Sequence, residues 1–343
     1  MKVALLGLPQ SGKKTLFSLL TGREVPASRR PEEALEGVAH VQDARVDRLT
    51  EICQPKRTVY AENRFTLCPD APWGEKSRAW LESARKCDLI CLVIRAFESG
   101  QVYHPAGGID PKRDREFLQS ELLLADMATV DTRLQRLEKE KRGGLRPEQK
   151  VEEEALRKCM QTLEDSRPVS ETVLEEHERT ALRSLDLVTF SPVLCVYNVG
   201  EEGLSTDFGP DTLAISCLLE SDIAAIESPA ERAEFLAASG LSEPGLTRMN
   251  HAVYSALGLM SFYTQGKDEC RAWTIRKGST APIAGGKIHT DIQRGFIRVE
   301  VIKFDDFVAE GSESAARDHG KMQTRGKDYV IEDGDVCHFL FNV

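Results

Sequence analysis

The sequence predicts an α/β fold in which a mostly parallel sheet is followed by a small β-rich module. Residues 2–7 form a short apolar run that ends in glycine, and a loop and a helix-favouring segment at 13–20 come directly after it. Three more apolar runs, at 88–96, 192–197 and 212–216, are separated by helix-favouring segments. Strands that alternate with helices in this way form parallel sheets whose strands are buried on both faces.

A different pattern separates the runs at 88–96 and 192–197. Apolar residues recur at steps of three to five from Leu118 to Leu137, which places them on one face of a helix. A charged stretch with a Gly143-Gly144 turn follows, and a second apolar stripe at 151–163 predicts a return helix. We therefore expect a helical hairpin, or coiled-coil insertion, at 128–186. This insertion divides the first domain into 1–127 and 187–274.

From about residue 275 the sequence becomes rich in β-favouring residues. Short stretches at 296–302, 328–331 and 336–343 lie between turn signals such as Asp333-Gly334-Asp335. They predict a separate β-rich domain at 275–343, built around at most a couple of helices.

The composition is that of an ordinary globular protein, with 41% hydrophobic and 29% charged residues. No apolar run approaches the ~18 residues of a membrane span, and the first residues do not resemble a secretory signal. We therefore expect a cytoplasmic protein that does not bind membranes. The nine cysteines lack the paired spacing of a zinc site, so we expect reduced, buried thiols.

The charge is unevenly distributed. The net charge of −10 excludes a global basic surface for nucleic acid. Between Phe262 and Lys303, however, eight Lys and Arg residues stand against four acidic ones. Such a basic patch can bind a phosphate backbone, although a mixed-charge stretch is also typical of a plain solvated surface.

The strongest local pattern is a phosphate loop. Residues Gly7 to Lys13 read GLPQSGK and match GxxxxGK between a strand and a helix. Backbone N–H groups can surround phosphates here, the helix N-terminus adds a positive dipole, and Lys13 is expected to reach the β- and γ-phosphates. The sequence therefore predicts nucleotide binding. The candidate residues are Gly7, Pro9, Gln10, Ser11, Gly12, Lys13, Lys14, Thr15 and Leu16.

The residue after Lys13 departs from this pattern. Ser or Thr is required there because its hydroxyl binds Mg²⁺, whereas this chain has Lys14. An ammonium group repels a cation but can itself neutralise phosphate charge. Thr15 is turned ~100° around the helix and does not replace the missing hydroxyl. We therefore expect no protein ligand for a metal and weak binding of Mg²⁺.

From these residues outward, the chain resembles the YchF family of Obg-like ATPases, a branch of the P-loop GTPase superfamily. GLPQSGKKTLF at 7–17 resembles the family's GLPNVGKSTLF, and HPAGGIDP at 104–111 resembles the segment that leads into its helical domain. RAWTIRKG at 271–278 and GFIR at 295–298 resemble its C-terminal TGS domain. The resemblance covers nearly the whole chain. It implies a P-loop domain followed by a β-grasp (TGS-like) domain.

The resemblance also implies that ATP is the preferred nucleotide, with GTP as the alternative. Where guanine-binding relatives have NKxD, this chain has NVGE, beginning at Asn198. The implied base-binding residues are Asn198, Val199 and Glu201, with Ser216 in a supporting loop. Outside such a role, Asn198 would be a plain turn residue at the end of a strand.

The family's catalytic and metal-binding positions are partly changed. Leu67 stands where the family has an aspartate, and Asp70 where it has a glycine that contacts the γ-phosphate. Asp70 either replaces the lost aspartate after a shift of the strand end or is a solvent-facing turn residue. His104 corresponds to the histidine with which the family is expected to orient water; an exposed loop histidine is the alternative. Together with Lys14, these changes predict weak or absent hydrolysis.

Two functions are consistent with these observations. The first is a weak ATPase that acts as a switch on the ribosome or on RNA, bound through the basic patch of the TGS-like domain. The second is a non-catalytic pseudo-ATPase scaffold that binds a partner or RNA through its TGS-like and helical modules. We expect a monomer in either case.

Overall fold

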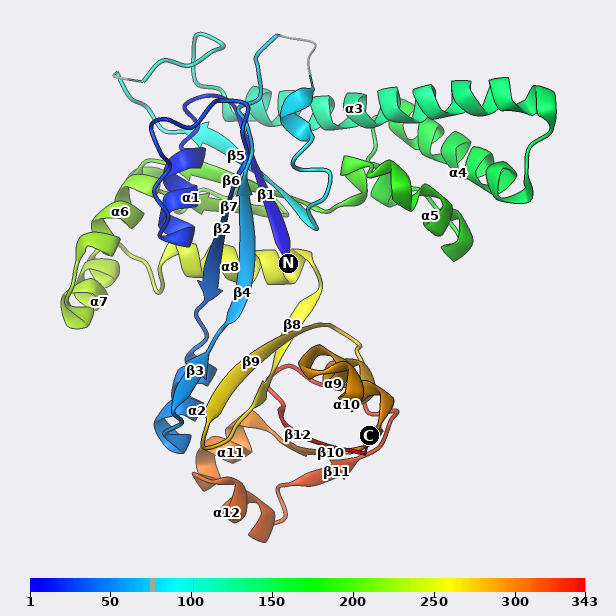
Figure 1. Cartoon of the computed structure of the whole chain (residues 1–343). Coiled ribbons are helices and arrows are strands. Elements are labelled where there is room, and N and C mark those ends of the chain that lie inside the picture. Colours follow the sequence, from blue (N-terminus) through cyan, green and yellow to red (C-terminus); the bar gives the residue numbers. More distant parts are fainter. Residues whose placement is uncertain (75–77, 101, 343) are drawn as a thin grey trace. The chain divides into compact units, whose positions relative to one another are not determined.

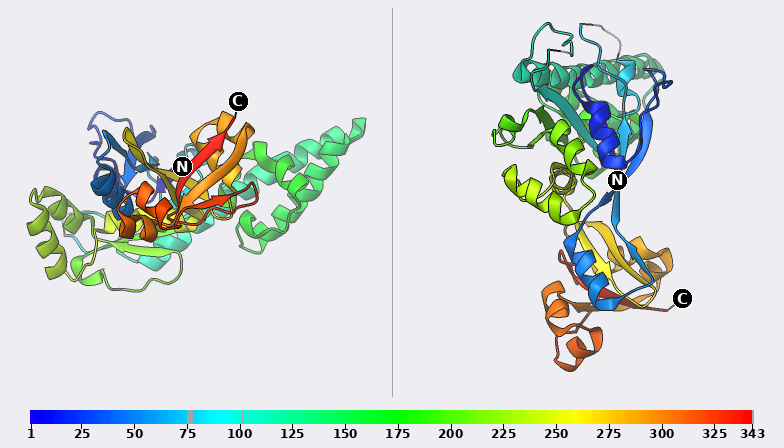
Figure 2. Two further views of the ribbon diagram at one scale, coloured as in Figure 1. Left: turned by 90° about the horizontal axis from the view of Figure 1, so that it is seen from below. Right: turned by 90° about the vertical axis from the view of Figure 1, so that its left-hand side faces the viewer.

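The computed structural model describes residues 1–74, 78–100 and 102–342, and the ribbon is drawn in Figures 1 and 2. These residues form two compact units. The first unit comprises 1–39 and 64–252, and the second comprises 40–63 and 253–343. Both units combine sheets and helices, which confirms the α/β class.

The first unit contains a six-stranded sheet in the order β2-β4-β1-β5-β6-β7. The strands are β1 (Lys2–Leu6), β2 (Leu35–Val41), β4 (Ala61–Leu67), β5 (Leu89–Ala96), β6 (Val193–Val199) and β7 (Thr212–Ile215). From β4 to β7 in this order, neighbouring strands pair in parallel. The central strand β5 is buried along Leu89–Arg95, because helices cover both faces of a parallel sheet. The four strands predicted from apolar runs are confirmed.

The predicted helical hairpin is confirmed as α3 (Pro111–Glu140) and α4 (Pro147–Glu164). The first half of α3 packs on the sheet through Leu118 and Leu122, whereas its second half packs on α4 through Val130 and Leu137. One long helix therefore belongs both to the sheet layer and to the hairpin, which extends away from the sheet (Figure 1). The unit's other helices are α1 (Lys13–Thr21), α5 (Glu176–Leu182), α6 (Cys217–Ala225), α7 (Pro229–Ala238) and α8 (Gly245–Ala256).

The second unit contains a six-stranded sheet in the order β11-β10-β12-β8-β9-β3. The strands are β3 (Arg57–Val59), β8 (Leu259–Thr264), β9 (Glu269–Arg276), β10 (Phe296–Ile302), β11 (Gln323–Arg325) and β12 (Val336–Phe341). One apolar cluster joins this sheet to α9 (Ala281–Ile288) and α10 (Thr290–Arg294). Another joins it to α2 (Ala44–Cys53), α11 (Phe304–Glu310) and α12 (Glu313–Asp318).

The second unit extends beyond the range 275–343 expected for the C-terminal domain. Strand β8 pairs with β9 and β12, and β3 pairs with β9, so that residues 40–63 and 253–274 share its sheet. Four helices lie between residues 281 and 318, more than the couple expected. The stretch 328–331 forms only an isolated bridge from Val330 to Thr280 rather than a strand. Val343, at the end of the expected last strand, lies outside the described residues.

All nine cysteines are free, and eight of them are buried. Among the described residues, no helix combines the length and the apolar character needed to cross a membrane.

Candidate functional site

The phosphate loop connects β1 to α1 at the carboxyl end of the parallel sheet. Two of its residues must be glycine. A Cβ atom on Gly7 would lie 2.5 Å from the carbonyl oxygen of Val93, and one on Gly12 would lie 2.1 Å from Asn198 Nδ2. Gly12 also has a φ of 91°, in the left-handed region. The sheet and the loop therefore pack too closely at these two points for any side chain.

The N-terminus of α1 is open to an anion. Its cap residue, Gly12, makes no side-chain hydrogen bond, so the first N–H groups of the helix are not capped by a side chain. The hydroxyl of Ser11 is buried and has no hydrogen-bond partner among the described residues. Unpartnered donors at the positive end of a helix fit a phosphate group. This loop thus fits the phosphates of a nucleotide.

Lys13 is buried and held by three oxygens. Its Nζ atom lies 2.9 Å from Asp70 Oδ1, donates to the carbonyl oxygen of Pro69 at 2.9 Å, and is 3.5 Å from that of Gly7. Burial lowers the pKa of Lys13, and the charge of Asp70 opposes that effect. Asp70 is therefore the counter-ion of the phosphate-loop lysine. It is thus not a free turn residue.

The segment that carries Asp70 is fixed to the phosphate loop. The backbone N–H of Cys68 donates to the carbonyl oxygen of Leu5 at 3.2 Å, and that of Ala71 donates to the carbonyl oxygen of Gly7 at 3.0 Å. These bonds continue the pairing of β4 with β1 past the end of β4. They hold the carboxylate beside Lys13.

A cavity of about 640 Å³ adjoins the phosphate loop. It is lined by Gly12 of the loop and Thr15 of α1, by 97–99 after β5, by 198–202 at the end of β6 and after it, and by Ser216–Leu218 and Ser221 around the start of α6. The segments that follow four strands, β1, β5, β6 and β7, thus meet at one edge of the sheet, the place where such sheets bind ligands. The volume suits a nucleoside.

Asn198 links these loops. Its Nδ2 atom donates to the carbonyl oxygen of Ser11 at 3.1 Å, and its Oδ1 atom accepts from the backbone N–H of Cys217 at 3.0 Å. Ser216 caps α6, because its side chain accepts from the N–H of Leu219. Both polar atoms of the Asn198 amide are therefore used within the protein. The exposed Glu201 lines the cavity, as do the exposed Glu98 and Glu202.

The residues at the metal position do not fit Mg²⁺. Lys14 is exposed, and no ion pair of Lys14 is found within residues 1–74, 78–100 and 102–342. Leu67, at the end of β4, is fully buried, and its carbonyl oxygen accepts from Arg29 Nη2 at 3.3 Å. In the part of the chain that the structure describes, no group of three His, Cys, Asp or Glu side chains gathers as a metal site. The guanidinium of Arg29 thus lies at the end of β4, where the family resemblance implies a carboxylate that supports the metal.

His104 is buried and fully hydrogen-bonded. It is 5% exposed; its Nε2 atom lies 2.8 Å from Asp114 Oδ2, and its Nδ1 atom accepts from the backbone N–H of Ala106. Because Nδ1 accepts, the ring proton is on Nε2 and is donated to Asp114. The carboxylate of Asp114 also accepts from Arg113 Nε and Nη2 at 3.0 and 2.8 Å. The alternative of an exposed loop histidine is therefore wrong.

The chain is similar to known proteins over its whole length. Ribosome-binding ATPase YchF of Escherichia coli O157:H7 is 37% identical over 362 residues, which cover 100% of this chain and 99% of the relative. The chain belongs to the YchF family. The Bacillus subtilis protein of the same name is 35% identical over all of both chains. The family model YchF-GTPase_C, described as a protein of unknown function (DUF933), matches residues 259–342.

A solved structure shows the same fold in this family. The Schizosaccharomyces pombe YchF GTPase superposes with a TM-score of 0.82 at 31% identity and covers 99% of this chain and 97% of its own. The YchF assignment made from the phosphate loop and the C-terminal segments is thus confirmed.

The structure brings most of the predicted site residues of this YchF-family chain together. Gly12, Thr15, Asn198, Val199, Glu201 and Ser216 line one cavity, and Asn198 joins it to the phosphate loop through the carbonyl oxygen of Ser11. His104 contacts Asp114 instead. Sequence reasoning missed Arg29 and the pairing of Asp70 with Lys13. The only local signal for Asp70 was an acidic residue where the family has glycine.

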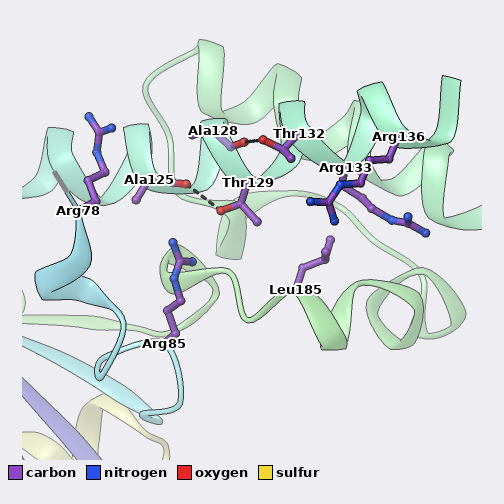
Figure 3. Close-up of a pocket in the computed structure, with 9 residues that line it drawn as sticks. All are labelled: Arg78, Arg85, Ala125, Ala128, Thr129, Thr132, Arg133, Arg136 and Leu185. Carbon is purple, nitrogen blue, oxygen red and sulfur yellow. Dashed lines mark hydrogen bonds between the residues drawn. The ribbon is translucent and has the colours of Figure 1, made fainter. Parts of the chain in front are cut away.

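A second cavity, of about 430 Å³, lies beside α3 (Figure 3). It is lined by four arginines (Arg78, Arg85, Arg133 and Arg136), together with Ala125, Ala128, Thr129, Thr132 and Leu185. Three of these arginines are already paired with carboxylates: Arg78 with Glu121, Arg85 with Asp126, and Arg133 with Glu152. This cavity is therefore close to charge balance.

Proposed function

We propose that this YchF-family chain binds an adenine nucleotide at its phosphate loop and acts as a ribosome-associated switch with slow or absent hydrolysis. The observation that carries the binding proposal is the uncapped start of α1 beside the buried, unpartnered hydroxyl of Ser11. The bacterial relatives are named ribosome-binding ATPases, whereas the fission yeast protein is named a GTPase. The names of the relatives therefore do not agree on which base, adenine or guanine, is bound.

Glu201 supports adenine over guanine. It lines the cavity as an exposed carboxylate, while both amide atoms of Asn198 are used to join Ser11 to Cys217. A carboxylate accepts hydrogen bonds only, so it can pair with adenine N6 as well as with guanine N1 and N2. Glu201, however, is one methylene longer than the aspartate of NKxD and therefore fits the guanine edge less well. GTP remains the alternative ligand.

Titration calorimetry with ATP and GTP tests the choice of base. We expect ATP to bind more tightly than GTP, and Glu201→Gln to reduce that preference while both nucleotides still bind. Exposed Glu202→Gln, on the same rim of the cavity, is the matched control. Tighter binding of GTP by the unmodified protein would reverse the assignment. Loss of all nucleotide binding in Lys13→Ala confirms that the phosphate loop is the site measured.

Slow hydrolysis is proposed from the residues at the positions where the family has metal-binding groups. Lys14 replaces the metal-binding hydroxyl, Leu67 replaces the supporting carboxylate, and Arg29 reaches the carbonyl oxygen of Leu67. A bound metal contributes several kcal/mol of transition-state stabilisation in phosphoryl transfer. We expect phosphate release near background in the unmodified protein, and a rise when Lys14→Ser and Leu67→Asp are combined. Rapid release by the unmodified protein would contradict this proposal.

The ribosome or RNA partner is proposed to bind the basic patch of the second unit. Arg276, Lys277 and Lys287 are exposed, and no ion pair of theirs is found among the described residues. We expect co-sedimentation with ribosomes to weaken as salt rises and to fall in a variant with these three residues changed to Glu, because phosphate contacts release counterions. Lys139→Glu with Lys150→Glu, at exposed positions of the hairpin, is the control. Salt-independent association would argue against the patch.

A further inference from the structure

All donors of the Lys13 ammonium group are already engaged. The group lies 2.9 Å from Asp70 Oδ1 and from the carbonyl oxygen of Pro69, and 3.5 Å from that of Gly7. Because an ammonium group has three donors, these three oxygens account for all of them. A phosphate can bind Lys13 only by displacing one of these oxygens.

Asp70 is the acceptor that can leave. The two carbonyl groups belong to backbone segments at the strand ends, whereas the carboxylate is on a side chain that is 39% exposed. Among the three groups that contact the Lys13 ammonium, the carboxylate of Asp70 is also the one with a negative charge. An incoming phosphate therefore competes with Asp70 for the same positive charge.

Asp70 cannot move far from the loop after it is displaced. Its neighbours Cys68 and Ala71 are hydrogen-bonded to Leu5 and Gly7. A tethered group keeps a high effective concentration near its partner. The carboxylate therefore remains close enough to repel whichever phosphate group replaces it, and this repulsion grows with the charge of that group.

We propose that Asp70 is a specificity-determining residue that occupies the place of the terminal phosphate at Lys13, so that the site favours a nucleoside diphosphate over the triphosphate. This inference rests on the proposed nucleotide binding. Both ligands need the phosphate loop and Ser11, but the triphosphate brings one more charged group beside the carboxylate. The site is thus biased toward the product of hydrolysis.

Calorimetric titrations with ADP and ATP test the proposal, each with and without MgCl₂. Without magnesium, we expect the unmodified protein to bind ADP at least about fivefold more tightly than ATP. With magnesium, this preference for ADP should be smaller, because magnesium neutralises part of the phosphate charge. Asp70→Asn should raise the affinity for ATP about tenfold and that for ADP less than about threefold. Asp70→Gly should change the two affinities in the same way, and it also removes the bulk of the side chain. Glu82→Gln removes the same charge at an exposed position of the same unit and should change neither affinity.

Three results are distinguishable. If both Asp70 variants bind ADP and ATP with the unmodified ratio, this inference is refuted while nucleotide binding stands. If Glu82→Gln shifts the ratio as much as Asp70→Asn, the effect is one of net charge, and the inference is also refuted. If the unmodified protein and both Asp70 variants bind neither nucleotide, the proposed function fails and the inference fails with it.

Discussion

Replacing His104 by alanine should unfold the first unit more easily rather than remove a catalytic group. The imidazole donates to Asp114 Oδ2 at 2.8 Å, and Asp114 is 1% exposed. A hydrogen bond to a charged group contributes roughly 1.5–3 kcal/mol, and deleting a buried ring adds a cavity. We therefore expect His104→Ala to lower the free energy of unfolding by about 2–4 kcal/mol. After this change, Arg113 is the remaining side-chain partner of the buried carboxylate.

Urea unfolding, followed by far-UV circular dichroism, measures this effect. His177→Ala is the matched control, because His177 is exposed on α5 of the same unit. Asp114→Asn should destabilise by a similar amount, and the double variant by less than the sum, because each change removes the same hydrogen bond. Phosphate release per folded molecule, measured in the Lys14→Ser/Leu67→Asp variant where it is expected to rise, should not change when His104→Ala is added. An unchanged unfolding midpoint together with lost phosphate release would refute this reasoning and make His104 a catalytic residue.

Three further changes test other parts of the first unit. Gly12→Ala should weaken nucleotide binding at least about tenfold in calorimetry, because its Cβ would lie 2.1 Å from Asn198 Nδ2 at a φ of 91°. Arg29→Met should lower the affinity for ATP several-fold at low salt, about 1 kcal/mol, because it removes a cation at the carbonyl oxygen of Leu67. Burial raises the pKa of Glu220, so folding disfavours its ionised carboxylate. The free energy of unfolding of the unmodified protein should therefore fall as the pH rises above the pKa that Glu220 has in the unfolded chain. Glu220→Gln should therefore have the higher unfolding midpoint at pH 8, with the difference vanishing in acid.

The sequence predicts those elements whose signal is local. The strands of the first sheet are continuous apolar runs, and the hairpin has a helical stripe on each side of a glycine turn, so both are recognised without knowledge of distant contacts. The second sheet is different. Its strand β3 pairs with β9, more than 200 residues away in sequence, and α2 packs on the same sheet. Only such long-range contacts place residues 40–63 in the second unit. The helices α10 to α12, at five to seven residues, are too short to show a clear period.

The same distinction holds at the site. Gly7 to Lys13 are consecutive, and their spacing alone predicts a phosphate loop. The partner of Lys13 is 57 positions further along the chain, and no local pattern shows that the carboxylate of Asp70 turns toward the loop. The burial of His104 likewise depends on Asp114, which lies on the next helix. Composition and spacing identify which side chains can bind a ligand or take part in catalysis. Contacts between residues distant in sequence decide which of these side chains are already paired within the protein.

The lost metal-binding groups are coupled, which explains why restoring one of them alone should have little effect. Arg29 donates to the carbonyl oxygen of Leu67, so a carboxylate introduced by Leu67→Asp would find a guanidinium beside it and pair with that rather than with an ion. Lys14→Ser alone would supply a hydroxyl but no supporting carboxylate. Lys14 and Arg29 thus place positive charges at this site, and Leu67 offers no carboxylate that could hold a metal ion between them. Recovery of hydrolysis should require Lys14→Ser and Leu67→Asp together, with a further gain when Arg29→Met is added.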